Sequence, residues 1–161
     1  MKEVKKTLIV GCPGSGKSFL SNKLGILTGI KVYHLDDLYW EEGWKEKAPE
    51  DWIKIQKKLV NKDEFIIDGN YLKSLEFRIK HSETIIYMDK GLMRCLFGFT
   101  KRTIKNLIGK NVDLPQKVKE QKGYRITENG FFDFCKFIIK FHLSQKKELN
   151  ELLSKYKSQK K

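Results

Sequence analysis

The sequence predicts an α/β fold in which a parallel sheet is covered by helices on both faces. Short apolar runs that suit strands alternate with longer segments whose apolar residues recur at helical spacing. The strand candidates are apolar throughout, which is typical of parallel strands buried on both sides. Neither an internal repeat nor a low-complexity linker interrupts the 161 residues. Residues 1–161 are therefore expected to form a single domain.

The elements can be placed in order along the chain. Four strands are predicted, at residues 7–10, 31–35, 64–68 and 84–88. Four helices are predicted, at residues 15–27, 49–60, 91–108 and 131–156. Four apolar residues of the first helix are expected to face the core: Phe19, Leu20, Leu24 and Leu27. Residues 109–130 carry glycines and a proline amid charges and are expected to form a mobile loop or a small lid.

The first predicted strand runs directly into a glycine-rich loop. Its eight residues are Gly11, Cys12, Pro13, Gly14, Ser15, Gly16, Lys17 and Ser18. Glycines let the backbone curl around an anion, and backbone N–H groups at the start of a helix attract negative charge. In a phosphate-binding loop of this kind, Lys17 contacts the β- and γ-phosphates and Ser18 binds Mg²⁺. The loop therefore predicts binding of a nucleoside triphosphate such as ATP, together with Mg²⁺.

Two acids follow predicted strands and are candidates to hold that metal through water. Asp68 ends an apolar run and precedes Gly69, and Asp89 ends the next run in the same way. Carboxylates at the ends of strands beside the phosphate loop suit this role. Asp68 is the preferred candidate because further polar residues follow it. Asp89 is expected to cap the next helix.

The second predicted strand ends in two adjacent acids followed by aromatic residues. Ligands bind at the carboxyl ends of strands in open parallel sheets, and an acid there can accept a hydroxyl proton during phosphoryl transfer. Asp36 is therefore the candidate base, and Tyr39, Trp40 and Trp44 could stack on a base or sugar. The alternative is that Asp36 caps a turn and the aromatic residues pack in the core or a lid. The three histidines, at 34, 81 and 142, are interpreted as structural.

Arginine is scarce among the 33 basic residues, so each one is a candidate for phosphate contact. Arg94 and Lys101 are seven residues apart on one predicted helix and share a face, with Arg102 beside it. Cations there would neutralise a phosphoryl group during transfer. Arg78, Arg94 and Arg102 are thus predicted charge clamps. Surface ion pairs are the alternative for each of them.

The surplus positive charge lies in the second half of the chain. Residues 1–89 carry a net charge of +1 and residues 90–161 carry +12. This asymmetry suits weak non-specific DNA contact, steering of anionic substrates, or a lysine-rich solvated helix. No apolar window is long enough to span a membrane, and the charged start resembles no signal peptide. The spacing of Cys12, Cys95 and Cys135 indicates neither a metal site nor a disulfide framework, which suits a reducing cytoplasm.

Taken together, four segments resemble those of bacterial DNA topology modulation proteins, a group related to adenylate kinase. The segments are residues 11–18, 34–44, 66–71 and 78–89. The resemblance covers about residues 5–108 and implies a P-loop NTPase three-layer sandwich with strand order 2-3-1-4-5. Asp36 is also similar to the acid that follows strand two in uridine and nicotinamide riboside kinases. Relatives continue into a further strand after the last helix, so either four or five strands are expected here. The lid region of the family is richer in arginine than residues 109–130, which hold only Arg125.

The sequence therefore predicts an ATP- and Mg²⁺-dependent kinase that acts on a small hydroxyl or phosphate acceptor, such as a nucleoside or nucleotide. The alternative is a regulator of DNA topology that binds DNA through its basic half and uses ATP as a switch. No helix-turn-helix or zinc-finger pattern indicates sequence-specific DNA recognition.

Overall fold

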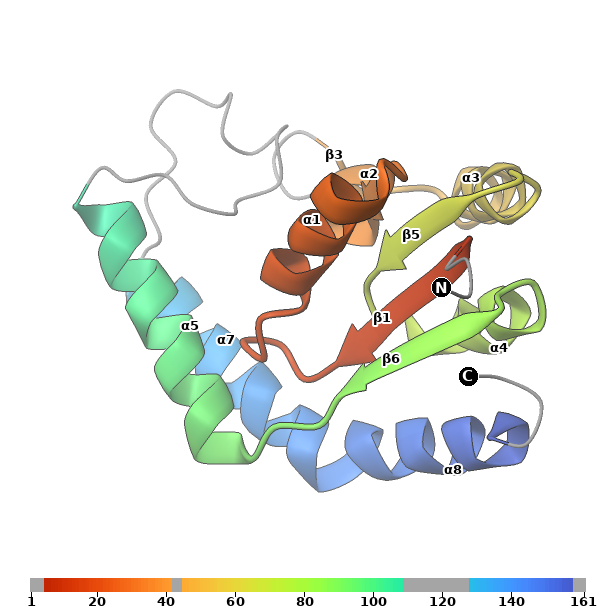
Figure 1. Cartoon of the computed structure of the whole chain (residues 1–161). Coiled ribbons are helices and arrows are strands. Elements are labelled where there is room, and N and C mark those ends of the chain that lie inside the picture. Colours follow the sequence, from red (N-terminus) through yellow and green to blue (C-terminus); the bar gives the residue numbers. More distant parts are fainter. Residues whose placement is uncertain (1–4, 42–44, 109–127, 158–161) are drawn as a thin grey trace.

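The computed structural model describes residues 5–41, 45–108 and 128–157 (Figure 1). Its centre is an all-parallel sheet of four strands in the order β2-β5-β1-β6. These strands are β1 (Lys6–Gly11), β2 (Val32–His34), β5 (Phe65–Asp68) and β6 (Thr84–Met88). Counted along the chain, the order is 2-3-1-4. The predicted α/β class and parallel sheet are confirmed, and the described residues contain no fifth strand in this sheet.

Helices surround the sheet as expected, with several elements that the sequence did not predict. The helices are α1 (Lys17–Thr28), α2 (Leu35–Tyr39), α3 (Pro49–Val60), α4 (Leu72–Lys80), α5 (Leu92–Leu107), α7 (Glu128–Lys140) and α8 (Lys146–Tyr156). A π-helical turn, η2 (Phe141–Gln145), joins α7 to α8. A small hairpin consists of β3 (Trp40–Glu41) and β4 (Lys45–Glu46). The unpredicted elements are α2, α4 and this hairpin.

Alternating side chains of the strands build a core on each face of the sheet. Leu8 and Val10 of β1 belong to a large cluster with residues of α3, α4, η2 and α8, whereas Ile9 points to the opposite face. There Ile9 and Ile66 pack against Leu20 and Leu24 of α1. Figure 1 shows α1 on one side of the strands and α8 on the other. Both faces are therefore covered, which explains why the strands are apolar throughout.

The buried face of α1 differs from the prediction. Leu20 and Leu24 contact the core, but Phe19 is 64% exposed and Leu27 is 82% exposed. The small residues Ser21 and Gly25 face the sheet instead, and a Cβ on Gly25 would overlap Val32. Because these small residues let the helix approach the strands closely, its larger neighbours turn to solvent.

The last predicted helix is present but begins earlier, since α7, η2 and α8 form one continuous run from 128 to 156. The second strand is shorter than predicted, because the chain turns into α2 at Leu35. Of the predicted lid, residues 109–127 lie outside the described residues, as do Trp44 and Arg125. None of the helices in the described parts of the chain is both long and apolar enough to cross a membrane.

Candidate functional site

The glycine-rich loop curls between β1 and α1 at the carboxyl end of the sheet. Gly11, Gly14 and Gly16 have φ angles of 142°, 81° and 93°, which side-chain-bearing residues rarely adopt. The loop borders a cavity of about 1700 Å³ that extends to α5 and α7. Every residue from Pro13 to Ser18 lines this cavity. The first N–H groups of α1, which have no partner within the helix, belong to the same end of the loop.

Lys17 is half-buried at the start of α1 and lines the cavity. Its Nζ donates a hydrogen bond of 2.9 Å to the Cys12 carbonyl oxygen, across the loop. Burial lowers the pKa of Lys17, and the negative charges of Asp68 and Asp36 oppose this shift. The ammonium group is thus held over the loop, close enough to Asp68 and Asp36 for both charges to act on it.

Asp68 ends β5 beside the loop and is 5% exposed. Its Oδ2 lies 2.9 Å from Nδ1 of His34 and 3.2 Å from the hydroxyl of Ser21. Burial by itself would raise the pKa of Asp68, but hydrogen bonds from His34 and Ser18 and the charge of Lys17 lower it. The carboxylate is therefore ionised and adjacent to Ser18. The two predicted metal ligands come together, and His34 orients one of them.

Asp36, the predicted base, lines the same cavity from α2. Its Oδ1 accepts a 2.8 Å hydrogen bond from the hydroxyl of Tyr71. The side chain is accessible from the cavity, yet the surrounding protein raises its pKa through desolvation, and the nearby charge of Asp68 adds to the effect. Tyr71 opposes the shift because it donates to the charged form. Asp36 is thus a carboxylate whose proton affinity is higher than that of an ordinary aspartate.

Aromatic residues surround Asp36. The ring of Tyr39 lies 5.0 Å from Trp52 and 4.8 Å from Tyr71, and Trp40 lies 5.1 Å from Tyr39. Tyr39, Trp40 and Tyr71 line the cavity, whereas Trp52 is 8% exposed and supports them from α3. Tyr71 has a φ of 40°, which is unusual for a residue with a side chain. This backbone geometry at the start of α4 places its hydroxyl beside Asp36.

Asn70 was not predicted as a site residue, although the polar run after β5 indicates its position. Its side-chain amide pairs with the backbone of Gly11: Oδ1 accepts from the Gly11 N–H at 2.9 Å, and Nδ2 donates to the Gly11 oxygen at 2.8 Å. These two bonds tie the segment after β5 to the first residue of the loop. Asn70 therefore positions the loop.

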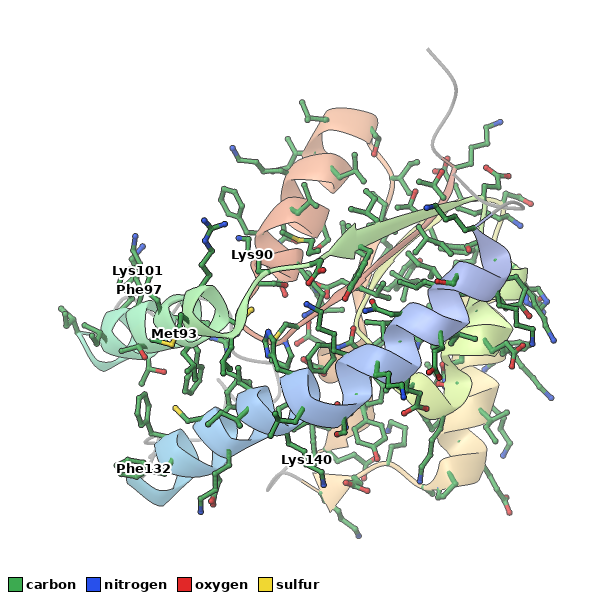
Figure 2. The ribbon with its side chains drawn as sticks, turned by 90° about the horizontal axis from the view of Figure 1, so that it is seen from below. Lys90, Met93, Phe97, Lys101, Phe132 and Lys140 are labelled. Carbon is green, nitrogen blue, oxygen red and sulfur yellow. The ribbon has the colours of Figure 1, made fainter. Side chains whose placement is uncertain are left out.

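Cations from α5 line the far side of the cavity. Lys90, Met93, Phe97 and Lys101 succeed one another along this helix and the turn before it, and Phe132 and Lys140 lie on α7 (Figure 2). Spacings of four residues place Met93, Phe97 and Lys101 on one face of α5. Arg94 and Arg102, two of the predicted charge clamps, also line the cavity.

Arg102 lies close enough to Lys17 for its charge to affect the pKa of that lysine. Its guanidinium carbon is 5.6 Å from the ring of Phe99 and 5.7 Å from that of Phe134. These two rings, stacked 4.3 Å apart between α5 and α7, form a platform for the guanidinium group.

The structure corrects the prediction for Arg78. This arginine is 0% exposed and does not line the cavity. Its guanidinium donates to the carbonyl oxygens of three consecutive residues, 69 to 71. Burial lowers its pKa to about 9, so it stays charged at neutral pH. Arg78 cannot clamp a phosphoryl group, because its donors hold the segment that carries Asn70 and Tyr71.

Two further predicted residues have their partners elsewhere. Asp89 forms an ion pair of 2.6 Å with Lys146 on α8, so it does not compete with Asp68 for the site. The Cys12 side chain is buried behind the loop and does not line the cavity. Burial raises the pKa of its thiol, and the neighbouring Cys95 adds to the shift.

The loop also packs directly against α5 through two glycines. A Cβ on Gly98 would overlap the carbonyl oxygen of Gly14, and a Cβ on Gly14 would overlap the carbonyl oxygen of Cys95. Only glycine at these positions lets the two backbones meet. Gly98 was not predicted, because a glycine inside a helix has no distinctive sequence signal.

We expect Gly98→Ala to lower the free energy of unfolding by about 1–3 kcal/mol, since backbone must shift to admit the methyl group. The gain of up to about 1 kcal/mol in helix propensity is too small to offset this. Urea denaturation measures the change. Gly91→Ala is the matched control, because a Cβ there meets no atom within 4 Å. Equal stability of Gly98→Ala and the native chain would show that the loop does not depend on this contact.

No protein-family model matches the chain, and a search of curated proteins also finds no match.

Proposed function

We propose that this protein binds ATP through the loop at residues 11–18 and transfers the γ-phosphoryl group to a hydroxyl or phosphate group of a small acceptor. The observation that carries the proposal is the convergence of Lys17, Ser18, Asp68 and Asp36 on one cavity. The loop, the candidate metal ligands Ser18 and Asp68, and the acid Asp36 all line this cavity, and so do the rings of Tyr39 and Tyr71. Phosphoryl transfer requires groups that bind the phosphates, ligands for the metal ion, and a residue that orients or deprotonates the acceptor.

In this proposal the loop N–H groups and Lys17 bind the phosphates, and Ser18 and Asp68 hold Mg²⁺ directly or through water. The metal supplies charge neutralisation on the phosphate oxygens. The donor set fits that ion, because a hydroxyl and an ionised carboxylate are the oxygen ligands Mg²⁺ prefers. Arg94 and Arg102 face the same cavity and would neutralise charge on the transferring group.

Asp36 would accept the proton of the acceptor hydroxyl as its oxygen bonds to the γ-phosphorus. The bond to the oxygen bridging the β- and γ-phosphates breaks in the same step, and ADP leaves with that oxygen. A raised pKa makes Asp36 a stronger base than an ordinary aspartate. The rings of Tyr39 and Trp40 offer a flat apolar surface for a base or sugar. The resemblance of residues 11–18, 34–44 and 66–71 to proteins related to adenylate kinase supports the same assignment.

The proposal is tested by measuring ADP release from Mg-ATP in the presence of nucleosides, nucleotides and small hydroxyl metabolites. We expect one acceptor class to raise ADP release well above the rate with water alone. The regulator alternative predicts no acceptor-dependent release. It predicts instead DNA binding that responds to ATP and persists at about 150 mM salt, where non-specific contacts to phosphates weaken. A fluorescence-anisotropy titration with supercoiled and linear DNA distinguishes the two functions.

A further inference from the structure

Three potential metal ligands from distant parts of the sequence meet behind the phosphate loop. They are Cys12 of the loop, Cys95 of α5 and His142 of the π-helical turn η2. Both cysteines are buried, and His142 is partly exposed. Their separation along the chain gave no indication of a metal site, but the fold brings the three side chains to one point. The phosphate-transfer chemistry proposed above uses none of these side chains.

The size of this cluster matches the coordination shell of one metal ion. The three ligand atoms all lie within 4.8 Å of one another, and Cys12 Sγ is 3.5 Å from His142 Nδ1. Zinc–sulfur and zinc–nitrogen bonds of about 2.3 and 2.05 Å at a tetrahedral angle place the two ligand atoms about 3.6 Å apart. The observed sulfur–nitrogen distance therefore needs almost no adjustment to accept the ion.

The second nitrogen of His142 is held as it is in metal-binding histidines. Nε2 lies 3.0 Å from the carbonyl oxygen of Lys90. A hydrogen bond donated by Nε2 leaves the lone pair on Nδ1, the nitrogen that faces Cys12, and such a bond commonly orients a ligating imidazole. The carbonyl oxygen of Ile138 also lies 3.0 Å from Nδ1. In the free protein this carbonyl oxygen would repel a lone pair on Nδ1. A cation bound at Nδ1 would remove the repulsion.

His142 is the partly exposed member of the cluster. His142 borders a surface hollow of about 590 Å³ that is separate from the nucleotide cavity and is also lined by Lys146 and Glu151. Lys146 is paired with Asp89 at 2.6 Å, so its charge is partly neutralised. The hollow therefore brings solvent to the His142 ring, and neither cysteine lines it.

We propose that Cys12, Cys95 and His142 form a binding site for one thiophilic divalent cation, with Zn²⁺ the best match. Two sulfurs and one imidazole nitrogen are a soft donor set that favours zinc over Mg²⁺ or Ca²⁺. The fourth position of the tetrahedron is filled by water or a backbone carbonyl oxygen. The ion would connect the phosphate loop to α5 and to the helix that runs from 128 to 156.

The test uses the full chain, metal-free, with its three thiols reduced and verified by thiol titration. Co²⁺ is added as a spectroscopic probe and is then displaced by Zn²⁺. We expect one equivalent of Co²⁺ to produce the intense visible absorption of a tetrahedral site and a thiolate-to-cobalt charge-transfer band. Both signals should disappear when one equivalent of Zn²⁺ is added, and the melting temperature should rise with zinc.

Cys95→Ser and His142→Gln should each abolish the charge-transfer band or weaken zinc affinity by at least about 100-fold. Cys135→Ser is the matched control and should keep both, because Cys135 lies outside the cluster. If Cys95→Ser fails to fold, His142→Gln supplies the same readout at a partly exposed position. Absence of the band in the native chain, or an unchanged band together with unchanged zinc affinity in Cys95→Ser, overturns the proposal. Formation of a Cys12–Cys95 disulfide by a chain that binds no metal would also overturn it and identify a redox pair.

Discussion

Replacing Lys17 by alanine should weaken ATP binding by at least about 100-fold. The ammonium group is half-buried over the loop, so its interactions with phosphate are only partly screened by water. A hydrogen bond to a charged group contributes about 1.5–3 kcal/mol, and each 1.4 kcal/mol is a factor of ten in affinity. Loss of two such bonds accounts for the expected change. Isothermal titration calorimetry with Mg-ATP measures it.

The same substitution should leave folding intact, because within the described residues Lys17 Nζ donates its one hydrogen bond to a carbonyl oxygen of the loop. A melting curve recorded on the same sample checks this. Lys23→Ala is the matched control: Lys23 lies on the exposed side of α1, over the ring of Phe19. An unchanged ATP affinity in a folded Lys17→Ala protein would refute the assignment of the loop. Equal weakening by Lys23→Ala would indicate a general charge effect.

Asp36→Asn should lower turnover on the identified acceptor by about 100-fold or more while leaving ATP affinity nearly unchanged. Asparagine keeps the size of the side chain and can still bond to Tyr71, but it cannot take a proton. The carboxylate belongs to α2 and is not part of the loop, so we expect nucleotide binding not to require it. Steady-state kinetics with separate titrations of ATP and acceptor distinguish a loss of turnover from a loss of binding.

The pH dependence provides a second readout for Asp36. The base must be ionised to act, and its pKa is raised above the ordinary aspartate value. Turnover should therefore fall as the pH is lowered through this raised pKa, and the acid limb should be absent from Asp36→Asn. Asp37→Asn is the control for turnover, because Asp37 is adjacent in sequence but does not line the cavity. It should keep the acid limb and move it to lower pH, since the charge of Asp37 helps to raise the pKa of Asp36. Full activity of Asp36→Asn would reduce Asp36 to a residue that stabilises the start of α2.

Local sequence patterns were sufficient for much of the fold. The strand at 84–88 and the helix at 49–60 were predicted with their observed bounds. The strand is a run of apolar residues, and the helix has an apolar stripe and a proline in its first turn. The glycine pattern of the loop likewise predicted its place between a strand and a helix. The acids at 36 and 68 were located by a topological rule, since parallel strands bring their carboxyl ends to one edge.

Other features depended on which segments meet in space. Arg78 was predicted from the sequence to contact phosphate. The packing of α4 instead buries its side chain, and the guanidinium group donates to the carbonyl oxygens of residues 69–71. The rotation of α1 was decided by the fit of Ser21 and Gly25 against the sheet, and no periodicity of apolar residues specifies that rotation. Gly98 became recognisable only through its contact with Gly14.

The sequence by itself thus determined the type and order of most elements and the residues that end the strands, because these depend on neighbours along the chain. The tertiary structure alone decided which side chains from distant segments come into contact. Tyr71 reaches Asp36, and Cys12 meets Cys95 and His142, through the order of the strands and the packing of α5 and η2. That packing determines how deeply each ionisable group is buried and which charges lie near it. Burial and nearby charges in turn determine whether the group can act as a base, hold a neighbouring segment in place or bind a metal ion.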